Sequence, residues 1–171
     1  ALIEALGRNQ GPTKLERCYF DNSVLANGLR GNSRLKSLRL RFCNSRDVGN
    51  QELLAIAGAL KENKGLVDLD LGWCRMSDES WGAICDSLKT HSILEVLDLR
   101  YVLTEMTSAV ITPRVQSLLE MMKVNKSIRT IHLLDRYAEH ELYRESVIPF
   151  LKSNRLQQRV RAIQKTRPIA Y

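Results

Sequence analysis

The chain has 171 residues, of which 44% are hydrophobic and 26% are charged, as expected for one globular domain with a hydrophobic core. No apolar run approaches the roughly 18 residues that a membrane-spanning helix needs, and no secretory signal peptide is visible. The formal net charge of +7 is concentrated at the C-terminal end, where six basic residues follow the last acidic residue, Glu145: Lys152, Arg155, Arg159, Arg161, Lys165 and Arg167.

A motif of three apolar residues recurs along the chain, with the second residue three positions and the third five positions after the first. Its starts are Leu15, Leu35, Leu66, Leu94 and Ile128. The copies at 35–43 and 66–74 are the clearest, whereas Leu15, Cys18 and Phe20 form the poorest copy. Side chains alternate across a β-strand, so each copy predicts a short strand whose motif residues point into the core.

The segments between the motifs predict helices, because their apolar residues are spaced i, i+3, i+4, i+7 and so share one helical face. These residues are Leu53, Ile56, Ala57 and Leu60, then Trp81, Ile84, Cys85 and Leu88, then Val115, Leu118, Leu119 and Met122. A shorter helix is expected over Val24–Leu29. The three longer helices are followed by Asn63, His91 and Asn125, where an asparagine can adopt the left-handed conformation that ends a helix; His91 is expected to act as a cap in the same place.

The motif fails after Leu156, where the next two positions of the pattern are Arg159 and Arg161. Leu156, Val160 and Ile163 are instead spaced as on a helix. We therefore expect residues 156–171 to form a basic capping helix and tail that covers the last unit, and Pro168 to end the helix.

Strand motifs that alternate with amphipathic helices, with starts 28 to 34 residues apart from Leu35 onward, resemble the ribonuclease-inhibitor-like class of leucine-rich repeat proteins. The resemblance covers about residues 2–155. It implies an α/β fold, a leucine-rich-repeat solenoid (horseshoe arc) with a parallel concave sheet and outer helices. Residues 1–155 would form about five units, and because the chain starts at Ala1 inside a helix-like segment, we expect the array to be truncated at its N-terminus.

Proteins of this class usually bind other proteins, so the resemblance implies a scaffold for protein binding. Such repeats also occur in GTPase-activating proteins, but the shared motif is structural and carries no catalytic residue over to this chain. The four cysteines, Cys18, Cys43, Cys74 and Cys85, have no zinc-site spacing. They fall at expected core positions, and buried free thiols suit an intracellular, cytoplasmic protein.

The residues between the motif leucines are expected to point outward along the concave face. Stacking the predicted strands places three aromatic residues in a ladder at one edge of the sheet: Phe42, Trp73 and Tyr101. Beside the ladder lies an acidic group of Asp68, Asp70, Glu95 and Asp98. Basic residues flank this group, with Arg39 and Arg41 on one side, Arg129 and His132 on the other, and Arg100 directly after a strand.

Exposed aromatic residues beside fixed charges are typical of protein-binding hot spots. The plainer alternatives are that the aromatic side chains pack on the loops that close each unit and that the acidic group is a solvated surface. Paired carboxylates can also act in acid–base chemistry or bind a metal, but here they are expected on an open sheet without an apolar pocket around them. We therefore predict no enzyme, no cofactor and no metal.

The sequence thus predicts a non-catalytic interaction module that binds a protein or peptide on its concave face. One alternative is nucleic-acid or anionic-surface binding through the basic C-terminal segment, although no aromatic residue lies between Phe150 and Tyr171 to stack on bases. Another is a regulatory or sensor fragment of a larger signalling protein.

Overall fold

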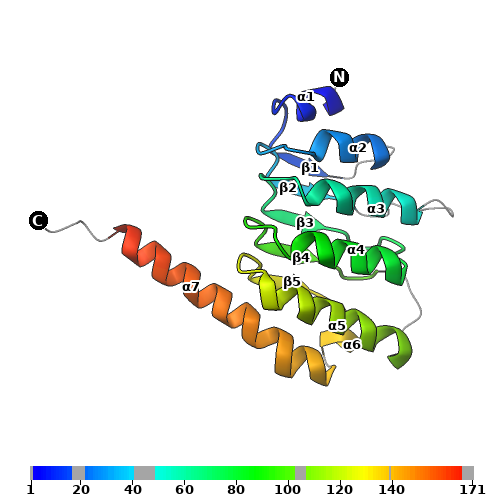
Figure 1. The fold of residues 1–171 in the computed structure, drawn as a ribbon, viewed down its shortest axis with the longest axis vertical. Helices are drawn as coiled ribbons and strands as arrows, with labels where there is room; N and C mark the ends of the chain where they lie inside the picture. The colour runs from blue at the N-terminus through cyan, green and yellow to red at the C-terminus, as the bar shows by residue number, and fades with distance from the viewer. Residues whose placement is uncertain (1, 17–21, 41–48, 103–106, 139, 167–171) are drawn as a thin grey trace, which may run out of the picture.

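The computed structural model describes residues 2–16, 22–40, 49–102, 107–138 and 140–166. Within these ranges five short strands form one parallel sheet whose strands follow the order of the chain. They are β1 (Lys14–Glu16), β2 (Ser37–Arg39), β3 (Asp68–Asp70), β4 (Val96–Asp98) and β5 (Thr130–His132). Figure 1 shows the strands stacked from one end of the molecule to the other. The predicted parallel sheet is confirmed.

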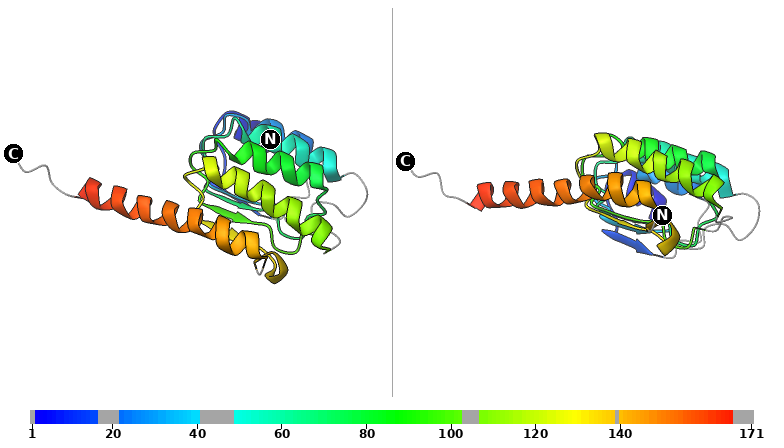
Figure 2. Two further views of the ribbon diagram at one scale, coloured as in Figure 1. Left: turned by 60° about the horizontal axis from the view of Figure 1, so that its bottom comes forward. Right: turned by 90° about the horizontal axis from the view of Figure 1, so that it is seen from below.

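Helices connect the strands and cover one face of the sheet. They are α1 (Leu2–Gly7), α2 (Asn22–Leu29), α3 (Gly49–Leu60), α4 (Asp78–Leu88) and α5 (Ser108–Val124), followed after β5 by α6 (Asp135–Ala138), the π-helix η1 (Tyr143–Val147) and α7 (Ile148–Thr166). Helices α2 to α5 lie side by side on this face, and α7 lies at the end of the stack beside β5 (Figures 1 and 2). We call the opposite side of the sheet the open face. The coarse α/β architecture with outer helices is therefore confirmed.

The register of the strands confirms the alignment of the last four motifs. Leu38 pairs with Leu69, Leu69 with Leu97, and Leu97 with Ile131, so the second residue of each motif occupies the same place in its strand. All four of these side chains are buried. The motif residues thus point into the core between sheet and helices, as predicted.

The alignment of the first motif was wrong by three residues. Leu15 pairs with Leu38, so it is the second residue of its motif and not the first. The backbone explains this register, because the carbonyl of Thr13 accepts hydrogen bonds from the N–H groups of Lys36 (2.7 Å) and Ser37 (3.1 Å). Cys18 and Phe20, which belonged to the expected copy, lie outside the described residues.

The predicted helical faces are buried in the core. Every residue of the three apolar helix faces is less than 9% exposed, and Trp81 and Leu88 lie among the deepest at 1% and 0%. Cys74 and Cys85 are free, buried thiols, whereas Cys18 and Cys43 lie outside the described residues. Burial, with a smaller contribution from the charge of Asp86, raises the pKa of the Cys85 thiol to about 12, so this thiol stays protonated and unreactive.

The asparagines that follow the helices act through their side chains. Asn63 Oδ1 accepts hydrogen bonds from the N–H groups of Gly65 (3.0 Å) and Leu66 (2.9 Å), and its Nδ2 donates to the carbonyl of Leu29 in the preceding unit (2.8 Å). Asn125 repeats this pattern and has an extended backbone with φ of −69°. The expectation of a left-handed helix end was therefore wrong at Asn125. Each buried amide instead ties one strand–helix unit to the next.

His91 takes the place of an asparagine and completes only half of this pattern. Its Nδ1 accepts a hydrogen bond from the N–H of Leu94 (3.1 Å), as an asparagine Oδ1 would. Its other ring nitrogen, Nε2, is buried without a hydrogen-bond partner among the described residues. The corresponding amide groups of Asn63 and Asn125 donate to the carbonyls of Leu29 and Leu88, the last residues of α2 and α4.

We expect His91→Asn to raise the free energy of unfolding by about 1 kcal/mol, because the new amide can donate to the carbonyl of Leu60, the last residue of α3, and a buried unpaired donor is removed. Urea unfolding of both proteins measures the difference. The reverse change at a complete position, Asn63→His, should lower stability. An His91→Asn protein that is no more stable than the wild type would contradict the pattern.

The same substitution should change how stability depends on pH. Burial lowers the pKa of His91 below its ordinary value of 6.5, so below about pH 6.5 the unfolded chain binds a proton that the folded chain resists. Wild-type stability therefore falls as the pH drops below that value, and the fall continues towards the folded pKa. The asparagine variant lacks this contribution, and its stability should decline less over the same range.

The cap of the last unit begins earlier than predicted. Helix α7 starts at Ile148, and Tyr143, Leu151 and Asn154 are buried. Asn154 continues the asparagine pattern, because its Nδ2 donates to the carbonyls of Asn125 (3.2 Å) and Ile128 (2.9 Å). The last unit is thus covered by η1 and the first part of α7.

Leu156 and Val160 were expected to pack against the last unit, and this was wrong. Their side chains are 63% and 45% exposed, whereas Arg155 and Gln158 on the same stretch of α7 contact the carbonyls of Arg129 and Ser127. Beyond this stretch α7 extends past the sheet (Figure 2). The side chain of Ile163 and residue Pro168 lie outside the described part. No helix in the described ranges combines the length and apolar character that crossing a membrane requires.

Candidate functional site

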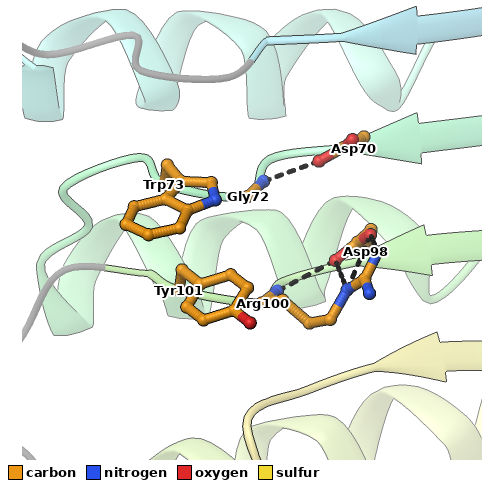
Figure 3. Close-up of a pocket in the computed structure, with 6 residues that line it drawn as sticks. All are labelled: Asp70, Gly72, Trp73, Asp98, Arg100 and Tyr101. Atoms are coloured by element: carbon orange, nitrogen blue, oxygen red, sulfur yellow. Dashed lines mark hydrogen bonds and ion pairs between the residues drawn. The ribbon is translucent and has the colours of Figure 1, made fainter.

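A small pocket lies where β3 and β4 end. Its volume is about 150 Å³, and it is lined by Asp70, Gly72, Trp73, Asp98, Arg100 and Tyr101. Figure 3 shows that these residues come in two equivalent sets, one from the end of each strand. The sequence predicted no apolar pocket around the acidic group, and two aspartates and an arginine line this pocket together with the two aromatic residues.

Two aromatic rings form one wall of the pocket. Trp73 and Tyr101 are stacked, with ring centroids 4.4 Å apart and ring planes 16° apart, and their side chains are 37% and 44% exposed. This part of the predicted aromatic ladder is confirmed, and its third member, Phe42, lies outside the described residues. The expectation that the rings are exposed is therefore correct for this pair.

Both aromatic residues have a strained backbone. Their φ angles are +64° for Trp73 and +58° for Tyr101, a left-handed conformation that bulky residues rarely adopt and that costs about 1–3 kcal/mol. The turn after β3 imposes it, because the N–H of Trp73 donates to the carbonyl of Arg100 (3.1 Å) and the N–H of Cys74 donates to the carbonyl of Leu71 (3.2 Å). Strain held at two equivalent exposed residues favours a functional role for the pair.

The two aspartates at the strand ends hold these turns in place. Asp70 Oδ1 accepts a hydrogen bond from the N–H of Gly72 (2.9 Å), and Asp98 Oδ1 accepts one from the N–H of Arg100 (3.0 Å). An aspartate that bonds the backbone two residues later is a common turn-forming device. Asp70 and Asp98 are 3% and 6% exposed, so the prediction that they face water was wrong.

Arg100 folds back onto Asp98 as well. Its guanidinium donates from Nε to Oδ1 (3.1 Å) and from Nη2 to Oδ2 (2.6 Å). Burial by itself raises the pKa of Asp98, but the hydrogen bonds from the side chain and N–H of Arg100, the charge of Arg100 and that of His132 outweigh it, so the pKa lies below its ordinary value. A carboxylate paired in this way suits a structural role better than proton transfer.

Gly72 leaves no room for a side chain. A Cβ at this position would lie 2.9 Å from Asp70 Oδ1 and 3.1 Å from the carbonyl oxygen of Arg100. Gly72 was not predicted as a site residue, although a glycine two positions after an aspartate at a strand end is a recognisable turn signal. It lets the turns after β3 and β4 approach each other closely enough for the rings to stack.

The pocket unites only some of the predicted site residues. Asp70, Trp73, Asp98, Arg100 and Tyr101 line it, while Arg41 and Phe42 lie outside the described residues. The other predicted residues lie elsewhere on the sheet: Arg39, Asp68, Glu95, Arg129 and His132. Arg39 is bound to Glu16 (2.9 Å) and Arg129 forms an ion pair with Glu95. In the described part of the chain, no three His, Cys, Asp or Glu residues are grouped to hold a metal ion.

The chain was compared with known proteins. No protein-family model and no curated protein sequence matches it. A solved structure titled "Leiomodin-1 Actin-Binding Site 2 (ABS2)" is similar, with a TM-score of 0.77 and 19% sequence identity over 95% of this chain and 92% of that chain. At this identity the likeness shows a shared fold and nothing about shared ligands.

These comparisons correct the assignment to the ribonuclease-inhibitor-like class of leucine-rich repeat proteins, together with the repeat, solenoid and horseshoe description that followed from it. No family model supports the assignment, and the similar solved structure is titled as an actin-binding site of leiomodin-1. The motifs indicate which side chains face the core. Apolar residues with this spacing are expected wherever parallel strands alternate with helices, so they do not identify one family. What stands is an α/β fold with a five-stranded parallel sheet.

Proposed function

We propose that this chain is a protein-binding domain without catalytic activity, and that the Trp73–Tyr101 pair is the centre of its contact surface. The observation that carries the proposal is the stacked, exposed and backbone-strained pair at the end of β3 and β4. Tryptophan, tyrosine and arginine are enriched in binding hot spots, and Arg100 lies beside the rings. Two rigid rings offer a large contact area at a small cost in conformational entropy.

Actin is the first partner to test, because the solved structure with the same fold is titled as an actin-binding site. The likeness supports the choice of partner only at the level of fold, since sequence identity is 19%. The aromatic pair supports protein binding independently of that choice. The binding test is therefore made with purified actin, both as monomer and as filament, and separately with an extract of cells that contain this protein.

A photo-crosslinking amino acid in place of Tyr101 tests the proposal. We expect it to crosslink one protein, identified by mass spectrometry, whereas the same amino acid in place of Val24 should not. Val24 is a matched control because it lies on α2 and its side chain is 44% exposed, as is that of Tyr101. Equal crosslinking at both positions, or none at Tyr101, would show that the aromatic pair is not the contact.

Affinity for the identified protein should then depend on the two rings. We expect replacement of both Trp73 and Tyr101 by alanine to weaken binding by at least about 30-fold, because truncating hot-spot aromatic residues costs about 2 kcal/mol or more. The free energy of unfolding should change by less than about 1 kcal/mol, since both side chains are exposed. Unchanged affinity would contradict the proposal.

A further inference from the structure

A second hollow, of about 240 Å³, lies where α7 passes the beginning of β4 and β5. It is lined by Val96, Arg129, Thr130, Arg155 and Arg159. Helix α7 runs antiparallel to β5 and the residues before it, because Arg155 contacts the carbonyl of Arg129 (2.7 Å) and the later residue Gln158 contacts that of Ser127 (3.5 Å). The hollow thus lies at the edge where the strands begin, away from the Trp73–Tyr101 pair at the edge where they end. We call it the arginine groove.

One wall of the arginine groove is fixed. Arg155 Nε donates to the carbonyl of Arg129 (2.7 Å), and its Nη2 lies 3.4 Å from Thr130 Oγ1. A guanidinium has five N–H donors, so Arg155 is held in position while several of its donors stay free. The side chain is exposed, and these free donors can reach a ligand.

The arginine groove carries uncompensated positive charge. Glu95 forms an ion pair with Arg129 and so balances one of the three guanidinium groups. Arg159, one helical turn after Arg155 and exposed, has no hydrogen bond or ion pair to any residue in the described ranges. No acidic residue follows Glu145 in the sequence. Two arginines one turn apart on one helical face can hold a carboxylate by paired, charge-assisted hydrogen bonds.

We propose that the arginine groove binds an acidic segment of a protein partner, with a glutamate or aspartate carboxylate paired to Arg159 and to the free donors of Arg155. The hollow is smaller than the pockets of roughly 300–1,000 Å³ that enclose small-molecule ligands, so it suits one side chain. Val96 and Thr130 also line the hollow and are half-buried, whereas Arg155 and Arg159 are exposed, so a single side chain can contact all four residues and a flat bilayer would meet only the arginines. Nucleic acid would lack a stacking partner, since no aromatic residue lies between Phe150 and Tyr171.

A fluorescein-labelled hexaglutamate peptide, followed by fluorescence anisotropy at low salt, tests the proposal. We expect Arg159→Glu to weaken binding of this peptide by at least about tenfold, because it places a like charge against the carboxylate. Arg161→Glu is the matched control: it makes the same change in charge on the same helix, and Arg161 is also exposed but lines a different hollow with Lys89 and Lys126. It should weaken binding by less than about threefold.

Several outcomes would overturn the proposal: no binding of hexaglutamate, equal weakening by the two substitutions, or tighter binding of phosphatidylserine vesicles or single-stranded DNA than of the peptide. Equal weakening would mean diffuse attraction by the basic helix. The inference rests on the proposed function only in that its ligand is a protein segment. The variant with alanine at positions 73 and 101 should bind hexaglutamate normally, so failure of the aromatic site and failure of the arginine groove are distinguishable.

Discussion

Replacing Arg114 by alanine is expected to lower the free energy of unfolding by about 3 kcal/mol. Arg114 lies on α5, and its side chain is 2% exposed. Its guanidinium donates to the carbonyl of Met76 (2.8 Å) and to Asp78 Oδ1 (2.7 Å), and it lies over the ring of Trp81, 5.1 Å from the centroid. One buried side chain therefore connects α5 to the turn before α4 and to α4 itself.

Most of this effect should come from packing and from the carbonyl of Met76, not from the ion pair. The side chain of Asp78 is 63% exposed, so its attraction to Arg114 is screened by solvent. The alanine variant leaves the carbonyl of Met76 without this donor and creates a void beside Trp81 and Tyr137, whose stacked rings have centroids 5.7 Å apart.

Urea unfolding of three variants separates these contributions. Asp78→Asn should cost less than about 1 kcal/mol, and Arg114→Met, which fills the space without donating, should fall between Asp78→Asn and Arg114→Ala. If Asp78→Asn destabilises the protein as much as Arg114→Ala, the ion pair dominates and the packing argument is wrong.

The strands β2 to β5 and helices α3 to α5 could be predicted because their apolar residues follow the periods of strand and helix. Leu69 and Leu97 pair as the motif alignment requires, and each helical face is buried. Arg114 shows the limit of this reasoning. It lies next to the apolar face of α5, and a prediction from apolar spacing alone treats an arginine there as exposed. Its partners on α4 come from a different unit and leave no mark in the local sequence.

The two ends of the fold were less predictable for physical reasons. The position three residues before Leu15 is Pro12, whereas the later motifs begin with leucine or isoleucine. The apolar pattern therefore did not identify Leu15 as a second motif residue, and the backbone hydrogen bonds of Thr13 determine the register. At the other end, the spacing of Leu156 and Val160 correctly indicates a helix but does not reveal whether a surface is present to cover that face. Helix α7 extends past the sheet, and the face stays exposed (Figure 1).

Every residue that lines the candidate site was predicted except Gly72, but the burial of Asp70 and Asp98 was not predicted. Stacking the predicted strands was enough to place Trp73 beside Tyr101, because the register repeats from unit to unit. The prediction that Asp70 and Asp98 face outward used the alternation of side chains along a continuing strand. Strands β3 and β4 instead end at these two residues, and the chain turns there. The partner-binding roles of these residues, the absence of catalysis and the intracellular location stay predictions.

Replacing both Asp70 and Asp98 by lysine should lower the free energy of unfolding by about 4 kcal/mol or more, through loss of two turn-forming acceptors and burial of two unpaired ammonium groups. Both aspartates are buried, and Asp70 Oδ1 already lies too close to Gly72 for a Cβ there, at 2.9 Å. The introduced side chains would also face Arg100, which would lose its partner Asp98.

Asp68→Lys is the matched control, because Asp68 lies on the same strand as Asp70, is only half-buried and has no hydrogen bond or ion pair in the described part of the chain. It should change stability by less than about 1 kcal/mol. A double variant as stable as this control would mean that the aspartates do not hold the turns, and the strained aromatic pair would then need another explanation.

A gentler substitution, Asp98→Asn, tests the same bonds through pH. The folded pKa of Asp98 lies below the ordinary value of 3.8, so the unfolded chain binds its proton first on acidification. The stability that the carboxylate contributes is fully present above about pH 3.8 and is lost as the pH falls from there through the folded pKa. Asp98→Asn should remove this part of the acid unfolding curve. Acid unfolding curves of the wild type and Asp98→Asn that coincide would contradict this role for the carboxylate.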